Sequence, residues 1–552
     1  MHQHVRHFVA LACAVAAVGC THKPEGASVS CSPPECPADS TLLLVAEVDP
    51  PSDSQLVRQE FGSVSIDPQS GLFALTLNAQ VTLSGNVHIG DGASAKSVAA
   101  TVVATRPSRI IGRPDVVYQA PVDPIDGNYV LVVSRSLDES EKYALRVTTT
   151  DPSLAPPKTL SVAAVTDTTV DVAFESPLKL PELHGTILDS LQQPLGGMQV
   201  QATTVPSGSS APVVVSTTTM TDGSGAFSIR LLANPPGKVL LTATPTTLAP
   251  DHLPSLAQMI DTTKLGATNT LTTNLQMPPL PATVRVTYQI SGTSTSGAKV
   301  AVTSATGVFT ADVSDPHATD GTKASYRATA MTNPLGEVTV DLFPNDGGNR
   351  AYAVTVTPDA TQPFGSKTTT INVGPPGYGP TIELALRSQL SGRVTDPDGQ
   401  PLHNLMVVPA PATVAAALGP TPLAVATTPQ QANAGADGRF SLRLDAGFWD
   451  VGLIPPPESM LPRLWLTQLD LNEDLDVGTV LVPRGVIVHG VVHDPSGAPL
   501  AHANVRLYTV TSGNTTCAPG DQQCLAPPRL RAEGSSGSDG IVSLILPSEP
   551  KP

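Results

Sequence analysis

The sequence has little charge, few aromatic residues and few cysteines. Only 14% of its 552 residues are Asp, Glu, Lys or Arg, 4% are aromatic, and six are cysteine. The formal net charge is −16, which excludes a nucleic-acid-binding protein, because such a protein needs a basic face to displace counterions from phosphate. No segment beyond the N-terminus has the apolar periodicity of a helix.

The residues that are abundant predict strands and turns. The chain has 55 prolines and 44 glycines, and these interrupt long runs of Thr, Val, Ser and Ala, the composition of many short strands joined by turns. A chain of this length is too long for one core and should hold about four or five domains. The sequence therefore predicts an all-β, multi-domain protein.

The first 19 residues are predicted to be a signal peptide. Arg6 supplies a positive charge, and Phe8 to Val18 form an apolar run of eleven residues. This run is too short to cross a bilayer and is typical of the hydrophobic region of an export signal. The protein is therefore expected to leave the cytoplasm.

The signal ends in Ala17-Val18-Gly19-Cys20, which resembles a bacterial lipobox with Ala17 in place of the usual leucine. The resemblance implies cleavage before Cys20 and acylation of its thiol. The membrane would then be a partner through the N-terminal lipid, and Thr21 after the cysteine favours the outer membrane or cell surface. An ordinary signal peptide with an incidental cysteine is the alternative.

The remaining cysteines of the exported chain form two close pairs, Cys31 with Cys36 and Cys517 with Cys524. In an oxidising compartment each pair can close a small disulfide loop. A metal site is the competing interpretation, but the second spacing matches no zinc pattern and no histidine lies near either pair. Residues 20–40 are rich in Pro and Ser and are predicted to form a flexible stalk.

The chain repeats one phrase. "LSGRVTDPDGQPLHNLMVVPA" begins at Leu390, "VHGVVHDPSGAPLAHANVRLY" at Val488 and "LHGTILDSLQQPLGGMQVQAT" at Leu183, and a degenerate copy begins at Ala282. The three clear copies and a shorter phrase, "LSGNV" from Leu83, share an anchor glycine, found at Gly185, Gly392, Gly490 and Gly85. The period is about 100 residues, the size of a domain rather than of a solenoid turn.

Each repeat continues with a second landmark, such as "DGRFSLRL" from Asp437 or "DGIVSLIL" from Asp539. Alternation of apolar and polar residues predicts a half-buried strand, and the Asp-Gly step suits a tight turn before it. A strand that ends in proline follows, as in "YAVTVTP" from Tyr352.

These features resemble the carboxypeptidase regulatory-like domain, a transthyretin-like β-sandwich. The pattern Gly-x-Val-x-Asp-x-x-Gly-x-Pro-Leu, then Asp-Gly-x-Phe-x-Leu, is matched best by the unit beginning at Leu390. The resemblance implies tandem antiparallel Greek-key β-sandwiches and implies no activity. Because similar folds include starch-binding-like domains, it also implies a glycan as one kind of partner.

The repeat predicts the boundaries of the units. They are an N-terminal half-repeat at 41–81, sandwich 1 at 82–180, sandwich 2 at 181–280, degenerate sandwich 3 at 281–387, sandwich 4 at 388–485 and a partial sandwich 5 at 486–552.

The two terminal units are incomplete. Residues 41–81 have the landmarks of the back half of a repeat, and residues 486–552 those of a front half. The two halves could complement each other, within one molecule or head-to-tail between molecules. We favour the simpler expectation, that each half packs on the neighbouring complete domain and so covers its exposed edge.

No pattern predicts a catalytic residue, a metal ligand or a cofactor. His489 and His493 lie about 13 Å apart on a strand, too far to share one ion. "DLNEDLDVG" from Asp470 alternates its acids along one strand face, whereas a calcium loop must curl around the ion. The sequence has no HExxH and no Gly-x-Ser-x-Gly. An enzyme is therefore not expected.

One aromatic residue is a candidate ligand contact. Trp465 shares a predicted strand face with Arg463 and Thr467, so partial exposure is expected, and an exposed ring can stack on a sugar. Two functions stay open. The first is a non-enzymatic envelope lipoprotein that acts as a surface scaffold or a protein-binding adhesion rod, with a reach beyond about 100 Å if the units are strung out. The alternative is a carbohydrate-binding surface protein.

Overall fold

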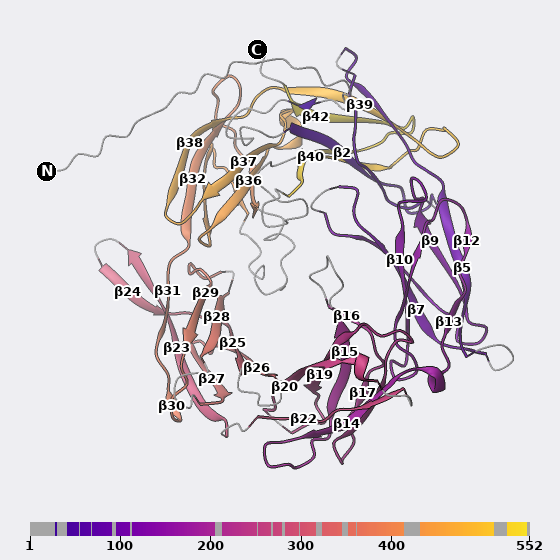
Figure 1. Cartoon of the computed structure of the whole chain (residues 1–552). Coiled ribbons are helices and arrows are strands. Elements are labelled where there is room, and N and C mark those ends of the chain that lie inside the picture. Colours follow the sequence, from indigo (N-terminus) through magenta and orange to yellow (C-terminus); the bar gives the residue numbers. More distant parts are fainter. Residues whose placement is uncertain are drawn as a thin grey trace, which may run out of the picture.

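The computed structural model describes residues 28–29 and 41–548, except for residues 55, 68, 91–94, 111–112, 205–211, 251, 266–268, 279–281, 297–298, 316–322, 345–350, 360, 413–430 and 513–526. The chain forms five β-sandwiches arranged as a closed ring (Figure 1). Helix in this part of the chain is limited to 3-10 turns, namely η2 (Pro177–Lys179), η3 (Thr262–Lys264) and η5 (Pro457–Ser459). The prediction of an all-β chain of sandwiches is confirmed.

All five sandwiches share one strand order. The first strand of each unit lies at the centre of an outer sheet, between the strand after the Asp-Gly turn, which pairs antiparallel, and the closing strand, which pairs parallel. The second strand belongs to an inner sheet, to which each sandwich contributes four or five strands. In Figure 1 the outer sheets follow the rim of the ring and the inner sheets face its middle. The outer sheets are thus mixed rather than wholly antiparallel.

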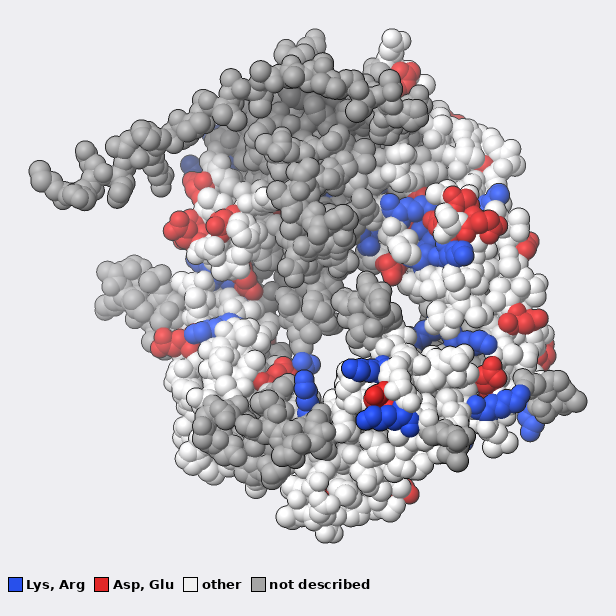
Figure 2. Space-filling model, viewed as in Figure 1, with Lys and Arg blue, Asp and Glu red and all other residues white. Residues whose placement is uncertain are grey.

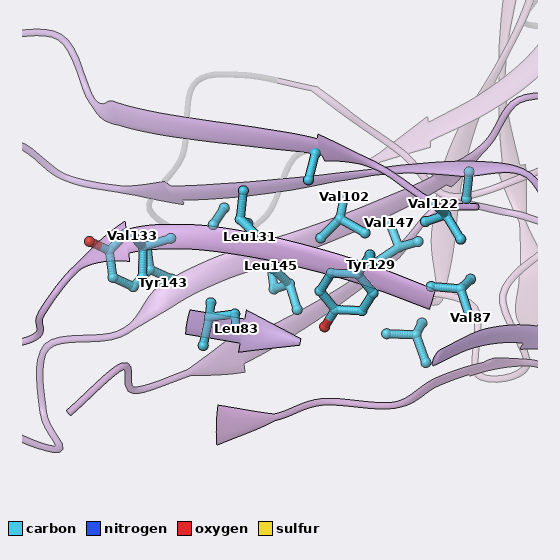
Figure 3. Packing of buried hydrophobic residues seen from close by; sticks show 14 of the residues in the cluster. Leu83, Val87, Val102, Val122, Tyr129, Leu131, Val133, Tyr143, Leu145 and Val147 are labelled. Carbon is cyan, nitrogen blue, oxygen red and sulfur yellow. The ribbon is translucent and has the colours of Figure 1, made fainter. Parts of the chain in front are cut away.

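Sandwich 1 is built from one continuous stretch. Its outer sheet contains β9 (Asn128–Ser134), β5 (Gln80–Ile89), β6 (Lys96–Ser97), β12 (Thr168–Thr169) and β13 (Val172–Phe174), and its inner sheet contains β11 (Lys158–Val162), β10 (Tyr143–Thr149), β7 (Ala100–Arg106) and β8 (Val116–Pro121). Alternate side chains of both sheets meet between them, and Figure 3 shows Leu83, Val102, Tyr129 and Leu145 in this core.

Sandwiches 2 and 3 share their inner sheets. In sandwich 2 the outer strands are β18 (Ala226–Arg230), β14 (Glu182–Leu188), β21 (Thr270–Thr272) and β22 (Leu275–Gln276), and the inner strands are β16 (Val213–Val214), β17 (Thr219–Met220), β15 (Met198–Thr204), β19 (Lys238–Pro245) and β20 (Ser255–Asp261). In sandwich 3 the outer strands are β24 (Lys299–Ser304), β23 (Val284–Ser296), β27 (Glu337–Leu342), β30 (Gly377–Tyr378) and β31 (Ile382–Leu384), and the inner strands are β26 (Lys323–Met331), β25 (Gly307–Asp315), β28 (Tyr352–Pro358) and β29 (Lys367–Ile371). Pairing of β20 with β26 joins the two inner sheets into one.

Sandwich 4 returns to the separate arrangement. Its outer strands are β35 (Arg439–Leu444), β32 (Ser388–Thr395) and β38 (Leu475–Leu481), and its inner strands are β34 (Ala432–Asn433), β33 (Met406–Pro411), β36 (Phe448–Ile454) and β37 (Leu464–Asp470).

The fifth sandwich, which we call the composite sandwich, is assembled from both ends of the chain. Its outer strands are β4 (Leu72–Thr76), β39 (Gly485–His493) and β42 (Ile541–Pro547), and its inner strands are β1 (Ser28–Val29), β2 (Thr41–Asp49), β3 (Gln59–Phe61), β40 (Asn504–Ser512) and β41 (Arg529–Ser535). β2 pairs antiparallel with β40 along its whole length, from Thr41 opposite Ser512 to Asp49 opposite Asn504. β4 pairs parallel with β39.

The preferred expectation that each terminal half packs only on its neighbouring domain is therefore wrong. The two halves share one core, in which Ala46 and Phe73 from the N-terminal part pack with Val505, Leu507 and Val542 from the C-terminal part. Complementation takes place within the chain because the four complete sandwiches curve round and bring the two ends together. For the same reason the units are not strung out as an extended rod.

The anchor glycines mark the point where the closing strand passes the first strand. A Cβ atom on Gly85 would lie 2.2 Å from the carbonyl oxygen of Val170, and one on Gly490 would lie 2.2 Å from the ring of Phe73. Both distances are far inside van der Waals contact, so only glycine leaves room for the closing strand.

In sandwich 3 the glycine lies on the closing segment, and the large residue lies on the first strand. Its first strand carries Tyr288 at the anchor position, opposite Val338, and the closing segment supplies Gly379, on which a Cβ would lie 2.2 Å from the Tyr288 ring. The glycine has moved from one strand to its neighbour, which explains why this copy of the repeat is degenerate in sequence but not in strand order.

Candidate functional site: the ring closure

The predicted lipidation site and disulfide cysteines lie outside the described residues. These are Cys20, Cys31, Cys36, Cys517 and Cys524. No helix in the described part of the chain is long and apolar enough to cross a membrane.

Trp465 is buried, so the expectation of partial exposure is wrong. Its side chain is 9% exposed, its Nε1–H donates to the Leu530 carbonyl at 3.0 Å, and the Arg529 guanidinium lies 5.2 Å from the ring centroid. The cause is the packing of β41 against β37, an inter-domain contact that the strand pattern does not reveal. A sugar platform needs a free ring face, and this ring has none.

The acidic run after β37 forms a turn. Asp470 ends β37 and accepts a hydrogen bond from the Asn472 amide at 3.2 Å, while Asp474 accepts one from the Gln389 amide at 2.7 Å. The carboxylates stabilise the turn and the start of the next sheet. In the described residues no group of three or more His, Cys, Asp or Glu side chains is placed to hold a metal ion.

The composite sandwich contacts a neighbouring sandwich on each side, and we call these two contact regions joints. The N-side joint connects it to sandwich 1, and its centre is Glu47. Only 1% of this residue is exposed, and its carboxylate contacts Arg113 Nη2 at 2.6 Å, Arg506 Nη1 at 2.7 Å and Arg58. A buried carboxylate is stable only when it is paired.

The three arginines around Glu47 come from three parts of the chain. Arg58 follows β2, Arg113 follows β7 of sandwich 1, and Arg506 lies on β40. A single carboxylate thus joins the N-terminal segment, the first complete sandwich and the C-terminal unit.

A second acid of the N-side joint, Glu60, reaches into the end of sandwich 1. It accepts hydrogen bonds from Ser108 Oγ at 2.8 Å and from the Arg109 amide at 3.0 Å, and it lies 3.4 Å from Arg106 Nη1. Arg106 is 1% exposed. Burial alone would lower the pKa of Arg106, but Tyr143 and the acids Glu60 and Glu141 raise it above its ordinary value and favour the charged guanidinium.

An apolar contact completes the N-side joint. Ile110 is fully buried against Val45, Tyr508 and Val510, and the Arg113 guanidinium lies 5.1 Å from the Tyr508 ring centroid. These side chains occupy the face of β2 and β40 opposite the sandwich core, so the two strands are buried on both faces.

The C-side joint connects the composite sandwich to sandwich 4. Arg529 on β41 pairs with Asp450 on β36, and both are at least 94% buried. Burial, and secondarily the charge of Arg531, lowers the pKa of Arg529 to about 10. At the edge of the joint, Arg463 Nη2 lies 2.7 Å from a Glu533 carboxylate oxygen.

The strand pattern alone did not identify these residues, although one signal was present. The stretch "TLLLVAEVD" does not alternate, and a continuous apolar run indicates a strand that is covered on both faces. A lone acid in such a run, Glu47, needs a buried partner. Because only 14% of the residues are charged, a cluster of charged side chains indicates a specific contact. Figure 2 shows most of the visible surface uncharged, with a mixed basic and acidic group at the upper right, where sandwich 1 begins in Figure 1.

The chain matches no protein family and no curated protein in sequence comparison. Among solved structures it is similar to a streptococcal ancillary pilin, with 12% identity over 56% of this chain and 99% of the pilin and a TM-score of 0.22. It is similar to the Bacillus anthracis TIE protein, with 10% identity over 73% of this chain and 74% of that protein and a TM-score of 0.16. Shaft pilin SpaA from Lactobacillus rhamnosus GG shares 11% identity over 37% of this chain and 99% of the pilin, with a TM-score of 0.21.

Proposed function

We propose that this chain is a non-enzymatic lipoprotein of the cell envelope, in which five carboxypeptidase regulatory-like sandwiches form a closed scaffold for contact with other proteins. The observation that carries the proposal is the composite sandwich. By sharing a core between both ends of the chain, it converts a string of domains into a ring.

Ring closure suits a protein that works outside the cell. The N-terminal and C-terminal segments contribute strands to one core, so fewer sheet edges are exposed to edge-to-edge pairing. Joints built from buried ion pairs and a shared inner sheet restrict motion between neighbouring sandwiches. The five units then present their loops in fixed relative positions, which favours binding to an extended partner surface.

The lipid anchor would act through Cys20. The residues between Cys20 and β1 would tether the composite sandwich, so the predicted stalk would be interrupted where β1 pairs with β2. The cysteine pairs Cys31/Cys36 and Cys517/Cys524 would each close a small loop in the oxidising compartment that export implies. In this arrangement the ring is held at the membrane by the one sandwich that contains both chain ends.

The anchor is tested by labelling cells with a palmitate analogue and fractionating them. The wild-type chain is expected to carry the label and to remain with the membranes, whereas Cys20→Ser is expected to lose the label and appear in the soluble fraction. A Cys20→Ser chain that stays in the membrane fraction would contradict the anchor. Crosslinking on intact cells then tests the scaffold role, which requires specific protein adducts that the ring-opening variants described below lose.

A further inference from the structure

The outward side of the outer sheets is mainly polar in sandwiches 2 to 4, carries Val130 and Val132 among polar residues in sandwich 1, and is mainly apolar in the composite sandwich. The comparison is made at three matched cross-strand pairs on the first strand and its antiparallel neighbour. The pairs are Thr82–Val132, Ser84–Val130 and Asn86–Asn128 in sandwich 1, Glu182–Arg230, His184–Ser228 and Thr186–Ala226 in sandwich 2, Arg285–Asp341, Thr287–Thr339 and Gln289–Glu337 in sandwich 3, Gln389–Arg443, Ser391–Ser441 and Arg393–Arg439 in sandwich 4, and Ile487–Ile545, His489–Ser543 and Val491–Ile541 in the composite sandwich.

The apolar side chains of the composite sandwich surround one polar pair on the outward face of three adjacent strands. We call this apolar surface the rim face; its residues are Leu72, Ala74, Ile487, Val491, Ile541 and Ile545. Leu72, Ile487 and Ile541 are 47%, 45% and 41% exposed, so they face solvent rather than the core. The polar pair at the centre of the face satisfies itself, because His489 Nδ1 lies 3.0 Å from Ser543 Oγ.

The rim face is too small for a stable protein interface of its own. Three strands about 4.8 Å apart, each presenting two or three outward residues, cover on the order of 200–300 Å². A stable protein–protein interface buries about 800 Å² on each partner. A second copy of this chain or a separate protein would therefore have to make most of its contact elsewhere, whereas a small apolar face can add to the hold of a lipid anchor.

The rim face belongs to the sandwich nearest to Cys20 in sequence, and this indicates what covers the face. The first described strand, β1, begins at Ser28, eight residues after Cys20, a distance that an extended chain spans in at most about 29 Å. β1 pairs with β2 of the composite sandwich. An acyl group on Cys20 would thus hold this sandwich, and no other, close to the bilayer.

We propose that the rim face rests in the interfacial layer of the lipid bilayer to which the chain is anchored. This inference rests on the proposed acylation of Cys20. Aliphatic side chains on a flat sheet face lose contact with water there, and the paired His489 and Ser543 lie level with the head groups. Sandwiches 2 and 3, on the opposite side of the ring in Figure 1, then lie farthest from the membrane and present their polar rims to the outside.

The experiment compares two matched positions on the acylated, full-length chain. Ser543 and Ser228 are both exposed, and each stands opposite a histidine on the first strand of its sandwich. The variants Ser543→Cys and Ser228→Cys are labelled with a polarity-sensitive fluorophore, and label on the native cysteines is subtracted with the unsubstituted chain. The proteins are then reconstituted on vesicles of phosphatidylethanolamine and phosphatidylglycerol and floated on a density gradient.

The inference predicts flotation of both proteins, with a blue-shifted emission and a several-fold lower quenching by aqueous iodide only for the label at position 543. Flotation with equal quenching at the two positions overturns the inference and leaves the anchor in place. Failure of both proteins to float overturns the anchor and the inference together.

A second measurement distinguishes membrane contact of the rim face from misfolding and from dimerisation. The double variant Ile487→Asp and Ile541→Asp, with the label at position 543, should float through its lipid but lose the blue shift, while the ring remains closed by solution scattering. If the unacylated chain instead dimerises and this double variant abolishes the dimer, the occupant of the rim face is a second copy and the inference is wrong.

Discussion

Sandwich 1 and the composite sandwich have the same strand pairing but differ in where their strands come from. In sandwich 1 the anchor residue Gly85 pairs with Tyr129, 44 residues along the chain. In the composite sandwich Arg506 contacts Glu47 across 459 residues. For a flexible chain this difference costs only about 2 kcal/mol in loop-closure entropy. The chain between these residues is folded, however, so the curvature of the other four sandwiches decides whether the ends can meet.

This difference makes closure a property of the whole ring. Sandwich 1 needs only its own strands, whereas the composite sandwich forms only when the joints position β2 beside β40 and β4 beside β39. Interactions that would be local packing in sandwich 1 therefore control the global shape when they occur in the composite sandwich.

Removal of residues 41–80 should have the largest effect. β39 to β42 would lose half of their core and should become sensitive to protease, while sandwiches 1 to 4 remain resistant. The sharper control moves the same residues to the C-terminus through a linker of about eight residues, the length that joins β9 to β10 in sandwich 1. This permuted chain should regain a resistant fifth sandwich. Equal sensitivity of both variants would contradict the assignment of these strands to one core.

Phe73→Ala should open the ring by removing the side chain that covers Gly490. Phe73 is 5% exposed, and loss of a buried phenylalanine costs about 3–5 kcal/mol. Native-state hydrogen exchange of β39 and β42 measures this local stability. The matched variant Val477→Ala, at the equivalent contact with Gly392 in sandwich 4, should have a smaller effect and should leave the shape unchanged. Equal losses of stability in Phe73→Ala and Val477→Ala would contradict a special role of Phe73 in ring closure.

Glu47→Gln should weaken the N-side joint by leaving three arginines around a neutral group. Loss of one partner of a fully buried pair costs more, but these arginines are 27% to 44% exposed, so we expect about 1–3 kcal/mol after solvent screening. Asp341→Asn in sandwich 3, where the partner Arg285 is 74% exposed, should produce no measurable change in thermal unfolding. A silent Glu47→Gln would show that the joint does not depend on its buried charge.

Acid should loosen the N-side joint slightly. Burial alone would raise the pKa of Glu141, but hydrogen bonds from Arg109 and from the Leu137 amide lower it below its ordinary value of 4.5. A carboxylate with a depressed pKa in the folded state contributes stability that is present above pH 4.5 and is lost as pH falls through the folded value. Hydrogen exchange of β3 and β7 between neutral pH and pH 3 should show the loss, and Glu141→Gln should flatten the dependence. If hydrogen exchange in Glu141→Gln depends on pH as in the wild type, other titratable groups cause the acid effect.

The strand pattern of a single sandwich could be predicted from the sequence better than the contacts between sandwiches. Period-two alternation and the Asp-Gly turns identified half-buried strands, because those features act within a few residues. The anchor glycines identified the first strands, although the shift of the small residue to Gly379 in sandwich 3 required a partner strand that is distant in sequence. In contrast, contacts between units depend on relative domain positions, and the local sign of them was limited to the non-alternating run around Glu47. Trp465 was for that reason expected to be partly exposed, and the pairing of Arg529 with Asp450 was not foreseen.

Solution scattering of unacylated residues 21–552, at concentrations where the mass is that of one chain, tests ring closure most directly. A compact globule of this length would have a radius of gyration of about 24 Å, and five sandwiches strung out over about 150–200 Å would give about 50 Å. The closed ring predicts a value above that of the globule and far below that of the extended string, and this value rises in Phe73→Ala. A value near 50 Å for the wild-type monomer would contradict closure.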